Sequence, residues 1–355
     1  MAHRVEQGIG RFSKIHVCTP IDNRLNLYII VHTVIQAKPA MSILNRPYFR
    51  DEEAAFAFLE GILWKDGTEC PHCGVVGTAY KIAANPAKRV RYGLWKCKDC
   101  RKQFTCKVGT VFEHARIPLH KALQAAYLLC SSKKGISANQ LSRALEITLK
   151  AAWFLAHRIR EAMRELDFAT QLGGEGKIVE ADETYVGGKE RNKHRSKRNN
   201  KHIGGVGKEM LFSLVERGGK VRSMHLPSVS ADNLRPIMKA QIDAEKTRLM
   251  TDGEGQYRLV GSMFKSHQVV NHGIGEYVRG DVYTNTIEGY FSILKRGIAG
   301  VYHHVSGQHL KRYMAEFDFR YNNRSALGVE DFDRTLAALA GIKGKRLTYK
   351  AIDLG

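Results

Sequence analysis

Two cysteine pairs with the same internal spacing constrain the fold of this chain more than any other feature of its sequence. They lie in 70-CPHC-73 and 97-CKDC-100, and the stretch between them is long enough for a β-hairpin. Each CxxC turn presents two thiolates to one tetrahedral Zn²⁺ ion, and four thiolates leave no open coordination position. The spacing therefore predicts a structural zinc ribbon, with the ion held by Cys70, Cys73, Cys97 and Cys100.

The other cysteines and the hydropathy pattern favour a cytoplasmic protein. Seven cysteines are an odd number, and four of them have metal-type spacing, which argues against a disulfide framework. Cys18, Cys106 and Cys130 have no partner pattern and are expected to be buried free thiols. No apolar run approaches the roughly 18 residues of a membrane span, so we expect no membrane partner.

The charge of the chain points to a polyanionic partner. Its 355 residues include 56 Lys+Arg and 35 Asp+Glu, which gives a net charge of +21. Nucleic acid is the commonest large polyanion, although basic ribosomal and membrane-surface proteins share such a charge. Basic side chains also gather in the stretch between the cysteine pairs and just after it, with aromatic residues among them. This combination suits contact with phosphates.

The first half of the chain divides into three parts. Residues 1–40 show no sustained periodicity and are expected to be a poorly structured arm or a non-native extension. The part at 41–117 is the predicted zinc ribbon, preceded by a helix in 51-DEEAAFAFLEGILW-64, whose acidic start and apolar spacing are typical of a capped helix. The third part, 118–172, is a helical segment.

The helical segment has the proportions of a DNA-binding motif. Residues 137–146, a short turn and then residues 149–165 match a helix-turn-helix, whose second helix normally enters the major groove. Generic helical pairs look similar, so the zinc ribbon and the net charge carry much of this interpretation. On it, we expect double-stranded DNA to be contacted by Arg158, Arg160 and Arg164.

The second half of the chain changes from helical to strand-like patterns. Strands are expected at 177–188, 210–217, 220–229 and 247–253, with a helix at 231–245 before the last of them. Mostly helical sequence follows. This order predicts an α/β domain with a mixed sheet over 177–330. The remaining residues, 331–355, are expected to be a C-terminal tail.

Acidic residues stand at unusual places in this domain. Asp182 lies within the apolar strand 178-IVEADETYVGG-188, where alternation puts Glu180 on its face and Glu183 on the other. An acid in such a strand is costly to bury without a cation or a partner. Asp252 closes the last strand, and the helix that begins in 283-YTNTIEGYFSILKRG-297 carries three polar groups along one side. These groups are Asn285, Glu288 and Lys295.

Isolated strand aspartates are more often structural than catalytic, but the ordered set is harder to explain in that way. Two strand-borne acids and one helix-borne acid suit a site for phosphoryl transfer with two Mg²⁺ or Mn²⁺ ions about 4 Å apart. At such a site, the ions activate the nucleophile and stabilise the leaving oxygen. The pattern therefore predicts metal-dependent chemistry on phosphates.

Several stretches together resemble a known family. They are CPHCG…CKDCRKQFTCKVGTVFEHARIPL, VEADETYVGGKERNKH, LMTDGEGQY, YTNTIEGYFSILKRGIAGVYHHVS and YMAEFDFRYNNR. In content and order, over about 41–330, they resemble bacterial insertion-sequence transposases of the ISXO-like DDE group. That group joins an N-terminal zinc ribbon to an RNase H-like catalytic domain. The resemblance implies a cytoplasmic, nucleoid-associated enzyme that binds terminal inverted repeats and cleaves and transfers DNA strands, as a homo-oligomer on its DNA.

The resemblance also implies roles for single residues. Asp182 and Asp252 would be the first two catalytic acids, and Glu288 the third, with Lys295 holding a DNA phosphate. Asparagine is sometimes given as the third residue in this group, so Asn285 stays an alternative. Glu288 is preferred because a carboxylate binds Mg²⁺ more strongly than an amide does.

The loop 187-GGKERNKHRSKRNNKH-202 is strongly basic. It is either a solvated loop or a clamp on the DNA backbone that becomes ordered on binding. Its candidate DNA contacts are Lys193, Arg195, Lys197 and Arg198. His303 and His304 are further candidates for residues beside the site.

Two other functions stay open. One is an inactive or domesticated zinc-ribbon DNA-binding protein descended from such an enzyme. The other is a nuclease of the same fold that cuts DNA but does not join it.

Overall fold

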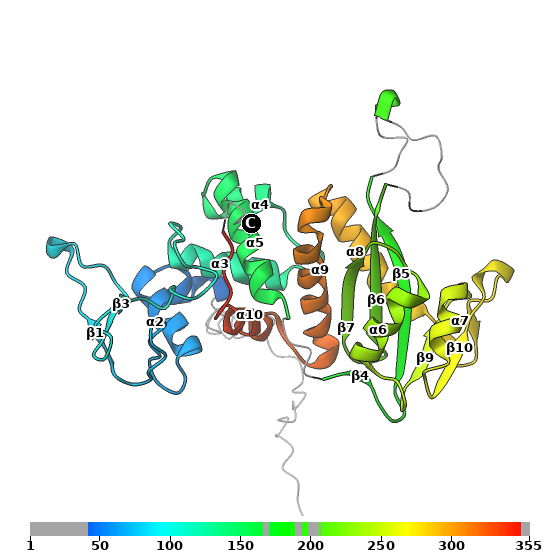
Figure 1. Ribbon diagram of the computed structural model, residues 1–355. Coiled ribbons are helices and arrows are strands. Elements are labelled where there is room, and N and C mark those ends of the chain that lie inside the picture. The colour runs from blue at the N-terminus through cyan, green and yellow to red at the C-terminus, as the bar shows by residue number, and fades with distance from the viewer. Residues whose placement is uncertain (1–41, 166–169, 189–193, 198–204, 206, 349–355) are drawn as a thin grey trace, which may run out of the picture. The chain divides into compact units, whose positions relative to one another are not determined.

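A computed structural model describes residues 42–165, 170–188, 194–197, 205 and 207–348. The chain divides into two units, Met1–Asn45 and Arg46–Gly355. The described part of the first unit is the short turn Ile43–Asn45 with its flanking Ser42. The expectation for residues 1–40 therefore lies outside the described residues. The elements below all belong to the second unit (Figure 1).

A small antiparallel sheet lies between and beside the cysteine pairs. Strand β1 (Ala79–Ile82) pairs with β2 (Leu94–Cys97), and β2 pairs with β3 (Gln103–Phe104). The helix α2 (Glu52–Leu63) precedes them, and the Asp51 carboxylate caps it by accepting the N–H of Ala54 at 2.8 Å. The hairpin of β1 and β2 is the arrangement that the cysteine spacing predicts.

Three helices follow, as the sequence indicates. They are α3 (Leu119–Ser131), α4 (Ala138–Leu145) and α5 (Leu149–Met163). The hydroxyls of Ser137 and Thr148 cap α4 and α5. Between α4 and α5 the chain turns at Glu146, which has a left-handed backbone conformation with φ of 50°. The short turn keeps the two helices in contact.

The segment expected to be a C-terminal tail includes a packed helix. Residues Asp331–Ala340 form α10, which packs against α3, and the Arg334 guanidinium donates to the Cys130 carbonyl at 2.9 Å. The chain then returns to the ribbon, where Gly344 N–H bonds the Gly109 carbonyl at 2.9 Å. The reason is burial of an apolar face that includes Leu339.

The second half of the chain builds a five-stranded mixed sheet in the order β10-β9-β5-β6-β7. Antiparallel pairing joins β5 to β6 and β6 to β7, whereas β9 pairs in parallel with both β5 and β10. The expected mixed α/β fold is confirmed. The strands are β5 (Ile178–Val186), β6 (Glu209–Glu216), β7 (Val221–Leu226), β9 (Arg248–Thr251) and β10 (Ser266–Val269).

Helices cover both faces of this sheet (Figure 1). On one face lie α8 (Asn285–Gly297) and α9 (Gly307–Asn322), and on the other α6 (Ala231–Gln241) and α7 (Gly255–Gly261). At the outer edge of β7, the Asn322 amide bonds both backbone groups of Val221, and the Asp318 carboxylate accepts the N–H of Ser223. Such coverage protects an edge strand from pairing with another chain. None of the described helices is long and apolar enough to cross a membrane.

Candidate functional site

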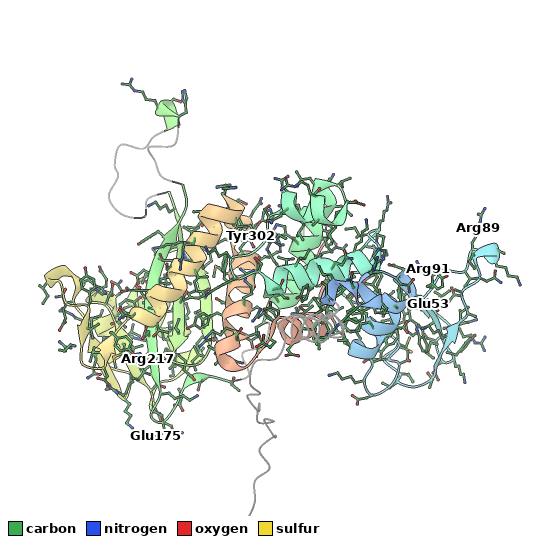
Figure 2. The ribbon with its side chains drawn as sticks, turned by 180° about the vertical axis from the view of Figure 1, so that it is seen from behind. Glu53, Arg89, Arg91, Glu175, Arg217 and Tyr302 are labelled. Carbon is green, nitrogen blue, oxygen red and sulfur yellow. The ribbon has the colours of Figure 1, made fainter. Side chains whose placement is uncertain are left out.

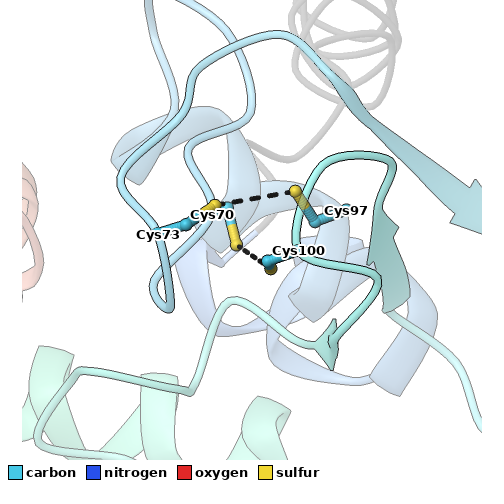
Figure 3. Close-up of side chains that lie close together, drawn as sticks. All are labelled: Cys70, Cys73, Cys97 and Cys100. Atoms are coloured by element: carbon cyan, nitrogen blue, oxygen red, sulfur yellow. Dashed lines mark hydrogen bonds between the residues drawn. The ribbon is translucent and has the colours of Figure 1, made fainter.

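The four paired cysteines form one cluster at the base of the ribbon (Figure 3). Their sulfur atoms all lie within 4.8 Å of one another. The Cys70 and Cys100 sulfurs are 3.6 Å apart, much longer than the roughly 2.05 Å of a disulfide. Backbone N–H groups, above all that of Cys100, lower the pKa of the Cys97 thiol to about 7. Four closely gathered thiols fit a tetrahedral zinc ion.

Two of the three unpaired cysteines lie in the described residues. Cys106 and Cys130 are buried free thiols, as expected, and burial raises the pKa of both. Cys18 lies outside the described residues.

The central strand β5 presents acids on both of its faces. Glu180 and Asp182 point toward α8, whereas Glu183 points toward α7, where it accepts the hydroxyl of Tyr257. Asp182 itself accepts only the N–H of Glu183 in the described structure, at 2.7 Å. Burial, followed by the negative charge of Asp252, raises the pKa of Asp182 to about 8. Burial and the neighbouring negative charge therefore disfavour the ionised form of the Asp182 carboxylate.

Asp252 reaches the same region from the end of β9. Because β9 runs parallel to β5, with Met250 opposite Glu180, the chain leaves the sheet beside Asp182. Asp252 accepts the N–H of Glu254 at 3.2 Å. Burial raises its pKa as well. A cation would favour the ionised forms of both carboxylates, which burial disfavours.

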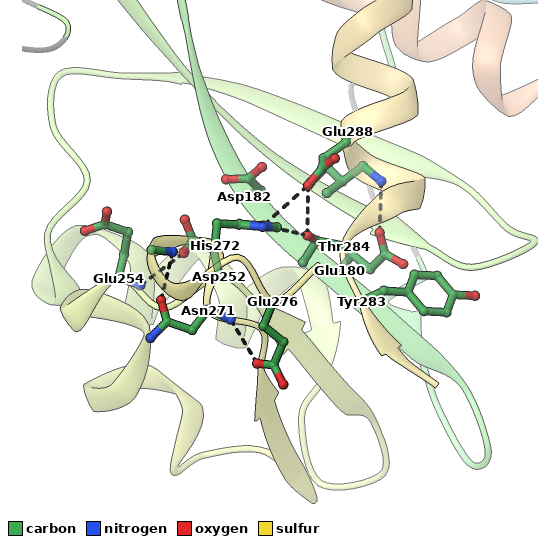
Figure 4. A network of polar contacts seen from close by, with 12 residues as sticks. Glu180, Asp182, Asp252, Glu254, Asn271, His272, Glu276, Tyr283, Thr284 and Glu288 are labelled. Carbon is green, nitrogen blue, oxygen red and sulfur yellow. Dashed lines mark hydrogen bonds and ion pairs between the residues drawn. The ribbon is translucent and has the colours of Figure 1, made fainter. Parts of the chain in front are cut away.

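The third acid comes from α8. Glu288 lies in the first turn of this helix, and its Oε1 accepts the Thr284 hydroxyl at 3.2 Å. Figure 4 shows Asp182, Asp252 and Glu288 around one space, each from a different element. Asn285, the first residue of α8, is exposed, and so is Lys295 two turns beyond Glu288. The structure thus places the three predicted acids around one space, with Asn285 one turn before Glu288 on the same helix.

A histidine that sequence reasoning missed belongs to this group. His272 Nε2 lies 3.4 Å from Glu288 Oε1 and 3.4 Å from the Thr284 hydroxyl. Its loop follows β10, as the Asp252 loop follows β9, and parallel strands bring such loops to one edge of a sheet. A predicted strand at β10 would have placed the loop with His272 near the Asp252 loop. The sequence of β10 is too polar to predict a strand. The suggested His303 and His304 instead lie exposed beyond the other end of α8.

Known proteins match both halves of the chain. Residues 171–322 match the ISXO2-like transposase domain, and residues 50–103 match the transposase zinc-ribbon domain. An uncharacterized protein in transposable element ISH50 of Halobacterium salinarum is 30% identical over 288 residues, which cover 77% of this chain and 91% of that protein. The chain belongs to the ISXO2-like transposase family. It is therefore a DDE-type transposase, a class of polynucleotidyl transferase for which DNA binding is implied.

The relative is archaeal, so the similarity does not assign this transposase to bacteria. Two solved structures also match. The simian T-cell lymphotropic virus intasome is 12% identical, with coverage of 56% of this chain and 65% of its own and a TM-score of 0.26. The Mos1 transposase paired-end complex is 12% identical, with coverage of 58% and 77% and a TM-score of 0.19. At these TM-scores neither structure carries an argument.

Two of the expected DNA contacts of the transposase are wrong. Arg158 is buried and donates to the Val111 carbonyl at 2.6 Å. Arg160 is 2% exposed and pairs with the fully buried Glu316 of α9 at 2.6 Å. The reason is that the second half of α5 packs against neighbouring segments instead of facing solvent. Arg160 faces α9, and Arg158 faces the chain at residues 111–113. Arg164 is exposed, although it pairs with Glu161 at 2.9 Å.

The basic loop of the transposase is described only in part. Arg195 is exposed in the short turn Arg195–Lys197, whereas Lys193 and Arg198 lie outside the described residues. The ribbon carries further exposed cations, and Figure 2 shows Arg89 and Arg91 on its hairpin. Basic side chains are thus available to DNA on the ribbon and beside β5.

Proposed function

We propose that this transposase binds the terminal inverted repeats of its element and catalyses strand cleavage and strand transfer with Asp182, Asp252 and Glu288. The observation that carries the proposal is the raised pKa of Asp182, about 8, in a strand where two further carboxylates approach it. A protein gains no stability from such crowding of like charges. Strongly perturbed acids in this setting favour a functional site over a structural one.

The donors fit divalent cations. Carboxylate oxygens are the ligands that Mg²⁺ and Mn²⁺ prefer, and these three acids would hold them. When bound, such ions supply Lewis-acid stabilisation of the attacking and leaving oxygens of a phosphoryl transfer. In the protein, His272 and Thr284 orient the Glu288 carboxylate through the two contacts described above. Lys295, exposed on the same side of α8, holds a phosphate of the bound strand.

DNA is bound by surfaces away from the acids. The exposed cations of the ribbon, together with Arg164 and Arg195, neutralise backbone phosphates. The exposed first turn of α5 is the part of this helix that remains free to enter a groove, because the later turns are buried. Two element ends are brought together by a homo-oligomer of the chain.

The identity of the third residue can be tested directly. Glu288→Gln keeps the size of the side chain and removes its charge, so strand joining should fall by about 10³-fold, an effect of roughly 4 kcal/mol on the barrier. Asn285→Ala should cost less than tenfold. Both variants should bind an element end as the wild type does, in gel-shift measurements on the DNA used for joining. Normal joining by Glu288→Gln, with an inactive Asn285→Ala, would assign the role to Asn285.

A further inference from the structure

A fully buried acid shares the active face of β5 with Asp182. Glu180 lies two residues before Asp182 and is 0% exposed. We propose that Glu180 and Arg217 form a positioning pair that fixes the start of α8, and with it Glu288, relative to Asp182. This inference rests on the proposed function, in which Glu288 is a metal-binding acid. Neither Glu180 nor Arg217 has a role in the chemistry described so far.

Glu180 supplies the cap that α8 lacks. The first N–H groups of a helix have no partner within it, and the Thr284 side chain, at the N-cap position, makes no cap hydrogen bond. Instead, the Ile287 N–H donates to Glu180 Oε2 at 2.9 Å, and Figure 4 shows this contact at the start of the helix. A carboxylate is favourable at a helix N-terminus, where the helix dipole is positive.

Arg217 ties the same acid to the chain that leads into α8. Its Nε donates to Glu180 Oε1 at 2.6 Å, while its two terminal nitrogens donate to the carbonyls of Asp281 and Tyr283 at 2.8 and 2.7 Å. The guanidinium also lies 3.5 Å from the centroid of the Tyr283 ring. Arg217 follows β6, and Tyr283 ends the short strand β12 (Val282–Tyr283). One side chain, labelled in Figure 2, therefore hydrogen-bonds to β5 and to the approach to α8 from the end of β6.

The pair specifies geometry more than it adds stability. A buried ion pair can often be replaced by apolar residues of similar volume at little cost in stability, because the pair also loses its hydration. Its directed hydrogen bonds cannot be replaced in that way. Glu288 is the residue after Ile287, so a shift in the start of α8 moves its carboxylate directly. Partners that orient metal ligands typically contribute about 10- to 100-fold to metal affinity or activity.

The test separates placement from folding. In the full-length protein, Glu180→Met with Arg217→Met removes both charges and keeps the volume of the side chains. Glu180→Gln removes the charge and keeps one acceptor oxygen, so it can accept from the Ile287 N–H or from Arg217 Nε but not from both. The matched control is Glu216→Gln, one residue from Arg217, because Glu216 bonds Lys177 and the Gly173 N–H and does not contact α8. The readouts are Tm without added divalent metal, half-saturating Mn²⁺ from the EPR signal of free Mn²⁺, and joining of a labelled DNA end.

We expect the double variant to fold with a Tm close to that of the control, to need about tenfold more Mn²⁺ and to join DNA about 100-fold more slowly. For Glu180→Gln, the half-saturating Mn²⁺ concentration and the joining rate should lie between those of the double variant and the wild type. The proposal is overturned if the folded double variant binds Mn²⁺ and joins DNA as the control does. If the double variant does not fold, values for Glu180→Gln equal to those of the control overturn it as well.

The variant Asp182→Asn distinguishes failure of the proposed function from failure of the positioning pair. Asp182→Asn, measured alongside, should lose Mn²⁺ binding and joining whether or not Glu180 matters. Normal joining by Asp182→Asn would contradict the assignment of the site itself. Loss of joining in Asp182→Asn, with control values in the Glu180 variants, contradicts only the positioning pair.

Discussion

Asp182→Asn is expected to abolish strand cleavage and joining while making the metal-free protein more stable. Asparagine has nearly the same shape but cannot carry the charge that a divalent ion requires, so joining should fall by at least about 10³-fold. DNA binding should persist, because it depends on cations elsewhere. The measurement is joining and gel-shift binding on one labelled DNA end. Loss of binding together with joining would indicate that Asp182 supports the fold instead.

The stability change has a predicted pH dependence. The pKa of Asp182 is about 8 in the folded protein, against an ordinary value of 3.8. Its contribution to folding stability is therefore fully present below pH 3.8 and is lost as the pH rises toward 8. Asparagine does not titrate, so the advantage of the variant should grow between pH 5 and pH 8, to about 1–2 kcal/mol after allowance for partial solvent screening. Calorimetry with zinc retained and no other divalent metal checks this. A variant less stable than the wild type at pH 8 would contradict it.

Cys97→Ser should release zinc and unfold the ribbon. Cys97 is fully buried at the end of β2, where it lies opposite Ala79 of β1. The binding energy of a structural zinc site is folding energy, about 10 kcal/mol or more at neutral pH. The matched control is Cys106→Ala, because Cys106 is also buried but lies outside the cluster. Metal analysis should find zinc in the control and not in Cys97→Ser, which should also lose specific end binding. Wild-type protein that purifies without zinc would refute the assignment.

The ribbon and the positions of the three acids along the chain could be predicted because their signals are local, whereas the role of the acids stays a prediction. Each CxxC turn is set by a few adjacent residues, and an acid such as Asp182 within an apolar strand stands out without knowledge of its partners. The burial of Arg160 could not be predicted in this way. A basic residue on a helix is predicted to be exposed unless its partner is known. The partner of Arg160 is Glu316, which lies on a helix far along the chain.

Other misses have the same physical origin. His272 follows a strand held in the sheet by pairing with β9 rather than by its own apolar pattern. The packing of the final helix α10 could not be predicted, because its apolar face is buried against α3, about 200 residues earlier in the chain. Glu180 was placed on the correct face of its strand, but its link to α8 depends on Arg217 and Ile287, which no spacing rule connects.

The central claim is that these three acids cut and join DNA. The most direct test incubates the wild-type protein and Mg²⁺ with a target plasmid and labelled DNA that ends in the sequences flanking its own coding region. The account predicts that the labelled 3′ ends become covalently joined to the plasmid, and that Asp182→Asn yields no such product. Binding without any cutting would favour a domesticated DNA-binding protein. Cutting without joining, even of ends supplied with a free 3′-hydroxyl, would indicate a nuclease and would contradict the account.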